Sequence, residues 1–248
     1  MRRLAVGIPA AIAVALIALP LAALLARTPW STLGEHVTSS TARQALFISL
    51  QTSFGALAVC LVLGLPLAWV LARSTAPGRH LLRALVLVPM VLPPVVGGAA
   101  LLFAFGRNGV IPLRLSFTTA GAVLAGAFVA LPFLVLALEA GLRQLDPRYE
   151  DAAAVLGAGP WSRFRHITLP QLAPALVAGS VLAWARALGE FGATITFAGN
   201  LPGETQTLPL AVYVALQSDR DAALALSTVL LGTAVAMIVA LRGRWLTR

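Results

Sequence analysis

The sequence predicts an all-α, polytopic membrane protein with six transmembrane helices. Hydrophobic residues make up 59% of the 248 residues and charged residues only 11%, whereas soluble domains carry about 25% charge. The mean hydropathy is correspondingly high, at +0.89. The apolar residues also form runs of about 20, the length that an α-helix needs to cross the hydrocarbon core of a bilayer.

Six runs have this length, and they divide the chain into a short N-terminal part, a main membrane domain and a tail. The first run, within "MRRLAVGIPAAIAVALIALPLAALLA", exceeds the roughly 7–15 residue core of a signal peptide, so we expect an uncleaved span. The predicted spans are 4–26, 45–72, 84–105, 121–139, 173–198 and 222–241. The predicted parts are 1–44 (helix and outer loop), 45–241 (main domain, with a cytoplasmic loop at 140–172) and 242–248 (cytoplasmic tail).

Arginine counts orient these helices. All eighteen basic residues are Arg; twelve fall in the N-terminus, the second and fourth connections and the C-terminus, and five in the opposite connections. The remaining one, Arg186, lies inside a predicted span. Positive charge favours the cytoplasmic side, so both termini are predicted there. A basic stripe on a soluble face, as in a nucleic-acid binder, is absent. The only cysteine, Cys60, lies in an apolar run, which predicts neither a disulfide nor a metal site.

The loop between the fourth and fifth spans is about 33 residues long and predicts a helix of its own. In "LDPRYEDAAAVLGAGP", Asp146 is the expected N-cap and Pro147 the first helical residue. Glu150 and Asp151 follow where the helix dipole favours anions, and Gly157 is the expected end. Such a helix either docks into a partner's groove or only covers the inner face of the bundle.

The segment "EDAAAVLGAGPWSRFRHITLP" resembles the EAA loop of ABC-transporter permeases. That pattern is Glu-Ala-Ala, a glycine four residues after the second alanine, and a terminal hydrophobic-x-Leu-Pro. Asp151 replaces the glutamate and keeps its charge, with Glu150 just before it. The resemblance implies a type I ABC importer permease fold and a coupling helix that docks on an ATP-hydrolysing subunit. The residues that it implicates in coupling are Glu150, Asp151, Ala152, Ala153, Gly157, Leu169 and Pro170, with Ile167 also matching.

Two further segments, "ARALGEFGATITFAGNLPGETQTLPLAVYVALQ" and "VLPPVVGG", are similar to molybdate-importer permeases, and the likeness extends over about residues 45–241. Sulfate, thiosulfate and tungstate permeases share part of the pattern. The transported anion is therefore expected to be molybdate, with sulfate, thiosulfate and tungstate as the alternatives. The resemblance implies a bacterial inner membrane location, two copies of an ABC ATPase that holds ATP and magnesium, an extracytoplasmic molybdate-binding protein and a second copy of this chain. It implies no cofactor on this chain itself.

Arg186 and Glu190 place two opposite charges inside the fifth predicted span. Spaced i and i+4, they share a helix face and can pair. A lone charge at this depth costs at least about 2.5–3.5 kcal/mol, so both are expected to face protein or water. The pair either locks the helix against its neighbours, as Gly189 and Gly192 would allow, or lines a path on which Arg186 attracts a passing oxyanion and Glu190 limits the binding strength.

Pro93 and Pro94 are expected to kink the third span, because proline removes a backbone donor. The kink is either static, with neighbouring groups satisfying the freed carbonyls, or a hinge or gate to which Gly97 and Gly98 add flexibility.

Energetics favour a powered transporter over its rivals. Inward movement of a dianion against the membrane potential costs about 4.6 kcal/mol per 100 mV, yet the chain has no G-x-x-x-x-G-K-[ST] phosphate loop. A partner must therefore hydrolyse ATP, and no catalytic residue is predicted here. An intramembrane protease is disfavoured because His36, His80 and His166 lie in loops and Glu190 is the only acidic residue deep in a span. A channel or secondary transporter would show internal repeats and paired broken helices, and neither is evident.

Overall fold

A computed structural model describes residues 2–245. Helices joined by turns make up this part of the chain, with no strand in it. The helices are α1 (Arg2–Arg27), α2 (Leu33–Thr38), α3 (Ser40–Arg73), α4 (Arg79–Val91), α5 (Pro94–Phe105), α6 (Thr119–Gln144), α7 (Pro147–Val155), α8 (Pro160–Arg163), the π-helix η1 (Phe164–Thr168), α9 (Leu169–Leu188), α10 (Gly192–Phe197), α11 (Leu208–Ser218) and α12 (Arg220–Trp245).

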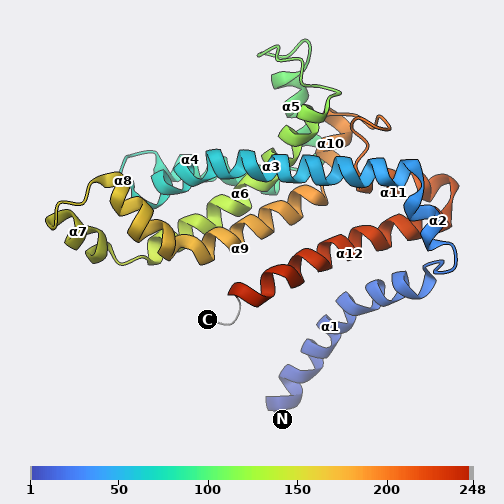
Figure 1. Cartoon of the computed structure of the whole chain (residues 1–248), viewed down its shortest axis with the longest axis horizontal. Coiled ribbons are helices and arrows are strands. Elements are labelled where there is room, and N and C mark those ends of the chain that lie inside the picture. The colour runs from blue at the N-terminus through green and yellow to red at the C-terminus, as the bar shows by residue number, and fades with distance from the viewer. Residues whose placement is uncertain (1, 246–248) are drawn as a thin grey trace.

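The centre of the molecule is a bundle of α3, α6 and α9 (Figure 1). Leu134 and Leu138 of α6 are fully buried against Leu71 of α3 and Leu172 of α9. Glycines allow α6 and α9 to approach closely: a Cβ on Gly141 would lie 2.5 Å from Ala175 Cβ. We call the two ends of this elongated bundle the α7 end and the α2 end.

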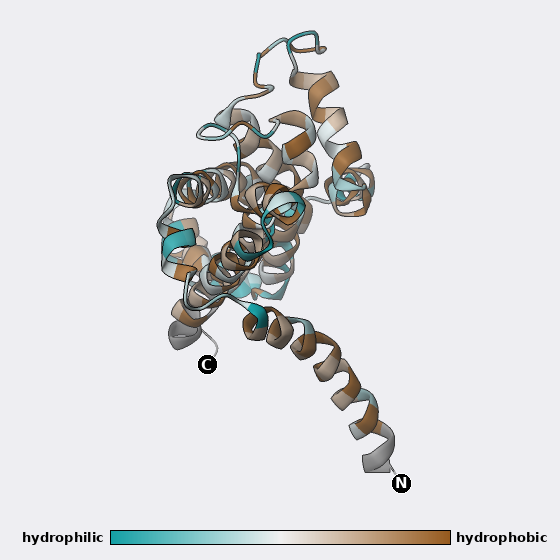
Figure 2. Cartoon of the chain, turned by 90° about the vertical axis from the view of Figure 1, so that its right-hand side faces the viewer, coloured by the Kyte–Doolittle hydropathy of each residue, from teal (hydrophilic) through white to brown (hydrophobic). Residues whose placement is uncertain are grey.

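The first helix stands apart from the bundle. Figure 1 shows α1 diverging from α12, and Figure 2 shows hydrophobic residues along its length. No residue in the apolar window of α1 is buried, although this window has the highest mean hydropathy of the candidate spans. Thr28 at its end is held to α12 by a 2.8 Å hydrogen bond with Thr228. The exposed apolar surface of α1 is what a lipid-facing helix requires.

Four predicted spans correspond to single helices, with boundaries a few residues wider than predicted: α1, α3, α6 and α12. Five helices are long and apolar enough to cross a membrane, and α4 with α5 brings the total to six, which agrees with the predicted number. The predicted tail 242–248 overlaps α12, and its residues 246–248 lie outside the described part of the chain.

The third span is bent at the prolines that were expected to kink it, whereas the fifth span is interrupted, which the sequence did not predict. The segment 84–105 is divided into α4 and α5, and the chain bends by 116° between them. Pro93 is the N-cap of α5 and Pro94 its first residue, positions that tolerate proline but cannot continue α4. The segment 173–198 is interrupted after Leu188, and α10 begins at Gly192.

The two broken spans meet each other and form a unit that we call the arm. In Figure 1, α5 and α10 project together from one side of the bundle. A Cβ on Gly98 of α5 would lie 2.8 Å from the carbonyl oxygen of Ala193, and one on Gly192 would lie 2.7 Å from Pro94 Cβ. Paired broken helices, which the sequence did not reveal, are therefore a central feature of this fold.

Candidate functional site

The helix predicted in the 140–172 loop is present as α7, with the predicted caps. Asp146 Oδ1 accepts a hydrogen bond from the backbone N–H of Arg148 at 3.0 Å, and Pro147 is the first helical residue. At the other end Gly157 has φ +85°, and the N–H of Ala158 donates to the carbonyl of Ala153 at 2.9 Å. This arrangement is a Schellman motif, in which glycine satisfies the last carbonyls by adopting a left-handed conformation.

The two adjacent acids on α7 have different surroundings. Glu150 points back to the bundle, where its Oε1 lies 3.0 Å from Arg73 Nη2 of α3 and accepts a hydrogen bond from Thr168 Oγ1 of η1 at 2.9 Å. The Arg73 guanidinium also lies 5.7 Å from the centre of the Trp69 ring. Asp151, at the position of the motif's glutamate, is exposed. Glu150 therefore holds α7 to the bundle, whereas Asp151 faces away from it into solvent.

The outer surface of the loop is apolar. Val155 and Leu156 are 88% and 87% exposed, and Tyr149 and Trp161 are also exposed. Large exposed apolar groups of this kind mark a surface that interacts with protein or membrane. The remaining motif residues contribute small or half-buried groups around this surface: Ala152, Gly157 and Pro170 are exposed, and Ala153, Ile167 and Leu169 are half-buried.

A second acidic group, Glu139 of α6, was not identified from the sequence. Its side chain is 3% exposed; Oε1 lies 2.7 Å from Arg143 Nη2 and Oε2 lies 3.5 Å from Arg83 Nε of α4. Arg143 also donates to the Leu71 carbonyl of α3 at 3.2 Å. Glu190 is therefore not the only deeply buried acid. The i,i+4 spacing of Glu139 and Arg143 was a visible signal, but Arg83 is remote in sequence.

Arg186 and Glu190 form the ion pair that their spacing predicted. Arg186 Nη1 lies 2.5 Å from Glu190 Oε2, and the side chains are 28% and 2% exposed. Glu190 Oε1 accepts a second hydrogen bond, from the Ala193 N–H at 2.7 Å. Since Ala193 belongs to α10, the carboxylate spans the break between α9 and α10. The pair thus links α9 to the first turn of α10 and leaves part of the Arg186 side chain accessible.

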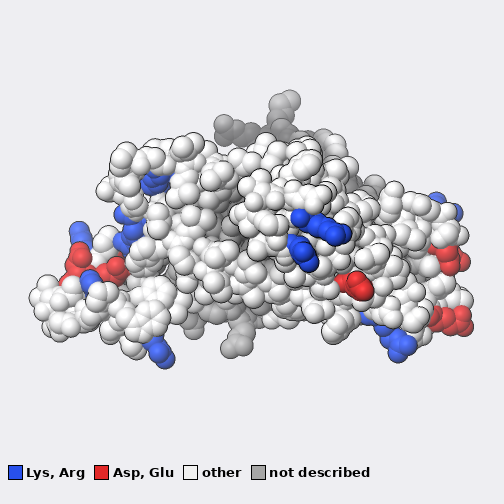
Figure 3. Space-filling view, turned by 90° about the horizontal axis from the view of Figure 1, so that it is seen from above, with Lys and Arg blue, Asp and Glu red and all other residues white. Residues whose placement is uncertain are grey.

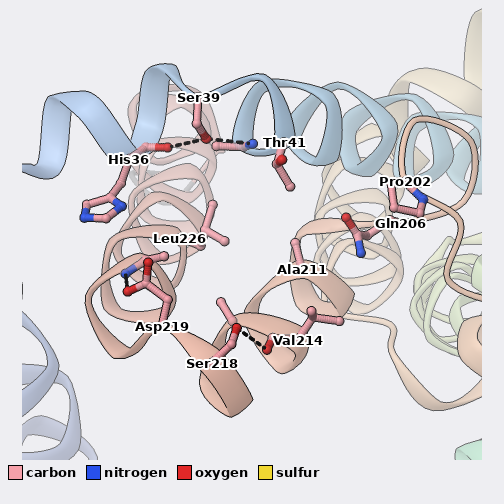
Figure 4. Close-up of a pocket in the computed structure, with 13 residues that line it drawn as sticks. His36, Ser39, Thr41, Pro202, Gln206, Ala211, Val214, Ser218, Asp219 and Leu226 are labelled. Atoms are coloured by element: carbon pink, nitrogen blue, oxygen red, sulfur yellow. Dashed lines mark hydrogen bonds between the residues drawn. The ribbon is translucent and has the colours of Figure 1, made fainter.

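A cavity of about 440 Å³ lies at the α2 end between α3, α11 and α12 (Figure 4). Two of its polar side chains are engaged in helix capping: Ser39 Oγ donates to the His36 carbonyl at 2.8 Å, and Asp219 Oδ1 accepts from the N–H of Ala222 at 3.0 Å. Both side chains cap neighbouring helices, and Asp219 brings a negative charge. This cavity therefore offers little to an anion.

Comparison with known proteins identifies the family. The family described as binding-protein-dependent transport system inner membrane component matches residues 61–248. The chain is 45% identical, over 96% of its length and 93% of the relative's, to the molybdenum transport system permease protein ModB of Mycobacterium tuberculosis. It is 44% identical to ModB of Escherichia coli, over 83% of this chain and 93% of that protein.

A sulfate permease and a solved transporter are also similar. The sulfate transport system permease protein CysT of Escherichia coli is 38% identical over 89% of this chain and 83% of its own. Among solved structures, a bacterial ABC transporter involved in the import of alginate has a TM-score of 0.69 at 19% identity, covering 95% of this chain and 90% of that chain. This likeness shows that the fold is that of an ABC importer's membrane subunit.

Proposed function

The chain belongs to the family of binding-protein-dependent transport system inner membrane components, and from this premise we propose that it moves molybdate. It is a multi-pass permease subunit and not an enzyme. The assignment of molybdate rests on the higher sequence identity to permeases named for molybdenum than to the sulfate permease. Tungstate and sulfate remain the alternatives that experiment has to distinguish.

The proposed assembly contains two copies of this chain, related by a two-fold axis, two cytoplasmic ATPase subunits and an extracytoplasmic molybdate-binding protein. The α7 end is assigned to the cytoplasm, together with both termini. The ATPases dock on the apolar surface of the 140–172 loop and hold ATP and magnesium. Exposed Val155 and Leu156 support this assignment, because burying them against a partner is favourable.

Coupling runs through Glu150. When the ATPases close, they pull α7, and the pull reaches α3 through Arg73 and the start of α9 through Thr168. Thr168 ends the π-helical turn η1, and such turns are frequent at functional positions. The 3.0 and 2.9 Å contacts of one carboxylate with two helices support this route.

Arg186 serves both as a structural residue and as a counter-charge along the path. Glu190 neutralises the Arg186 charge. The Arg186 side chain is 28% exposed, which leaves guanidinium donors for a passing oxyanion. The break at Pro93 and Pro94 is a fixed bend that carries the arm, because Gly192 packs directly on Pro94.

Uptake in cells tests the transported anion. Cells that lack the gene and then regain it are measured for molybdenum, tungsten and sulfur uptake at nanomolar oxyanion. Loss and rescue of molybdenum uptake alone is the expected result. A change in sulfur uptake alone would refute molybdate and leave the permease assignment intact.

A matched pair of glycine variants tests coupling. Gly157→Ala places a side chain at φ +85°, which costs about 1 kcal/mol, whereas Gly159→Ala at φ −64° carries no such strain. Neither Cβ would meet another atom within 4 Å. We expect Gly157→Ala alone to lower the number of anions imported per ATP hydrolysed in proteoliposomes. Equal behaviour of the two variants would contradict a coupling role for the Schellman turn.

A further inference from the structure

The connection between α5 and α6 carries a second basic site. Arg107, Arg114, Ser116 and Phe117 line a cavity of about 500 Å³ at the tip of the arm. Its polar side chains are two guanidiniums and one hydroxyl, and no carboxylate lines it. Figure 3 views the molecule from above, the side from which the arm projects. It shows a basic patch near the middle of that face, remote from the charged groups at the two ends and with one acidic side chain beside it.

These two arginines differ from those inside the bundle. Arg73, Arg83, Arg143 and Arg186 each lie within ion-pair distance of a glutamate. Among the described residues, Arg107 and Arg114 have no such partner. Two like charges around one cavity repel each other, and an anion between them converts this repulsion into attraction.

The backbone of this connection is held in a costly conformation. Arg114 and Phe117, with φ +53° and +59°, are the only non-glycine residues of positive φ in the described chain. Such conformations are rare for residues with a Cβ and concentrate at ligand-binding positions. The N–H of Phe117 donates to the carbonyl of Phe197 in α10 at 3.2 Å. The connection is thereby attached to the helix that Glu190 caps.

The donor set indicates the ligand. A guanidinium presents a planar fork of N–H donors that matches two oxygens of one oxyanion, and the Ser116 hydroxyl adds a third donor group. We propose that Arg107, Arg114 and Ser116 form an external capture site for a tetrahedral oxyanion dianion. The site deepens the proposed function, on which it rests: it receives the same anion before the anion passes Arg186.

Equilibrium dialysis with radiolabelled molybdate tests this site on the purified permease–ATPase complex without its binding protein. We expect Arg107→Gln/Arg114→Gln to weaken binding by at least about tenfold. The control, Arg43→Gln/Arg220→Gln, removes two exposed arginines from other predicted outer segments and should change binding less than about twofold. Sulfate should compete with molybdate, and chloride at equal ionic strength should not.

Folding and alternative roles are separated by further measurements. Arg107→Lys/Arg114→Lys keeps both charges and loses the forks, so intermediate affinity is expected even where the glutamine variant assembles poorly. Equal losses in the control variant, or no binding by the wild-type complex, would overturn the proposal. So would unchanged molybdate binding with lost binding-protein association, which would indicate a docking surface. Wild-type uptake, measured separately, shows whether the proposed function itself fails.

Discussion

Two buried glutamates illustrate two ways of holding charge inside this bundle. Glu139 and Glu190 each pair with an arginine four residues away, and both residues are 2% exposed. Glu139 also faces Arg83 of α4, and its partner Arg143 donates to α3, so this cluster joins three helices. Glu190 instead joins Arg186 of α9 to the first turn of α10, across a break within one segment.

This difference predicts that loss of the two carboxylates lowers the stability of the protein by unequal amounts. The arginines around Glu139 are 41% and 44% exposed, so water can solvate them if the carboxylate is lost. Arg186 is 28% exposed and has a single carboxylate partner. Loss of the Glu190 carboxylate, in the middle of a span, should therefore destabilise the protein more than loss of the Glu139 carboxylate at the end of the bundle.

The largest effect is expected from Glu190→Gln. The amide can still accept from Ala193 but leaves the Arg186 charge unpaired, which should cost about 3 kcal/mol. The apparent Tm of the purified complex measures this loss. Arg186→Gln/Glu190→Gln, which removes both charges, should recover part of it; a double variant as unstable as the single one would show that the charge imbalance is not the cause.

Gly98→Ala tests the packing of the arm around the same break. Its Cβ would meet backbone atoms of Ala193 at 2.8 and 2.9 Å, and overpacking of this kind costs about 2 kcal/mol. Gly97→Ala is the matched control, since only the Phe128 side chain lies within 4 Å of its Cβ. Equal Tm values for the two variants would mean that α5 and α10 are free to separate, as a hinge requires.

Glu139→Gln should be milder, with a loss of about 1 kcal/mol, because the ion pairs at the α7 end are partly solvated. The loss should shrink in a background that already carries Arg143→Gln, since the stronger partner is then absent. An effect as large as that of Glu190→Gln would contradict the solvation argument.

Glu150→Gln should have the smallest effect on stability, since both partners of this ion pair are partly exposed. Its effect should appear in coupling, as more ATP hydrolysed per anion imported in proteoliposomes. Glu35→Gln, an exposed acid at the opposite end, is the control. A normal transport ratio for Glu150→Gln would exclude this carboxylate from the coupling route.

Much of the candidate site was accessible from local sequence. The caps of α7, the left-handed glycine at 157 and the pairing of Arg186 with Glu190 depend on residues at most five positions apart, and their structures agree with the prediction. The inward direction of Glu150 was not predicted, because its partners Arg73 and Thr168 come from other helices.

The number of apolar spans, the position of the long loop and the local geometry of α7 follow from the sequence alone, because hydropathy and capping act over a few helical turns. Tertiary structure revealed that the fifth span is interrupted and that α5, beyond the proline bend, packs against α10 as the arm. It also placed Glu139 beside Arg83 and attached the strained α5–α6 connection to α10. These features depend on contacts between distant residues, where close backbone approach and burial outweigh local helix propensity.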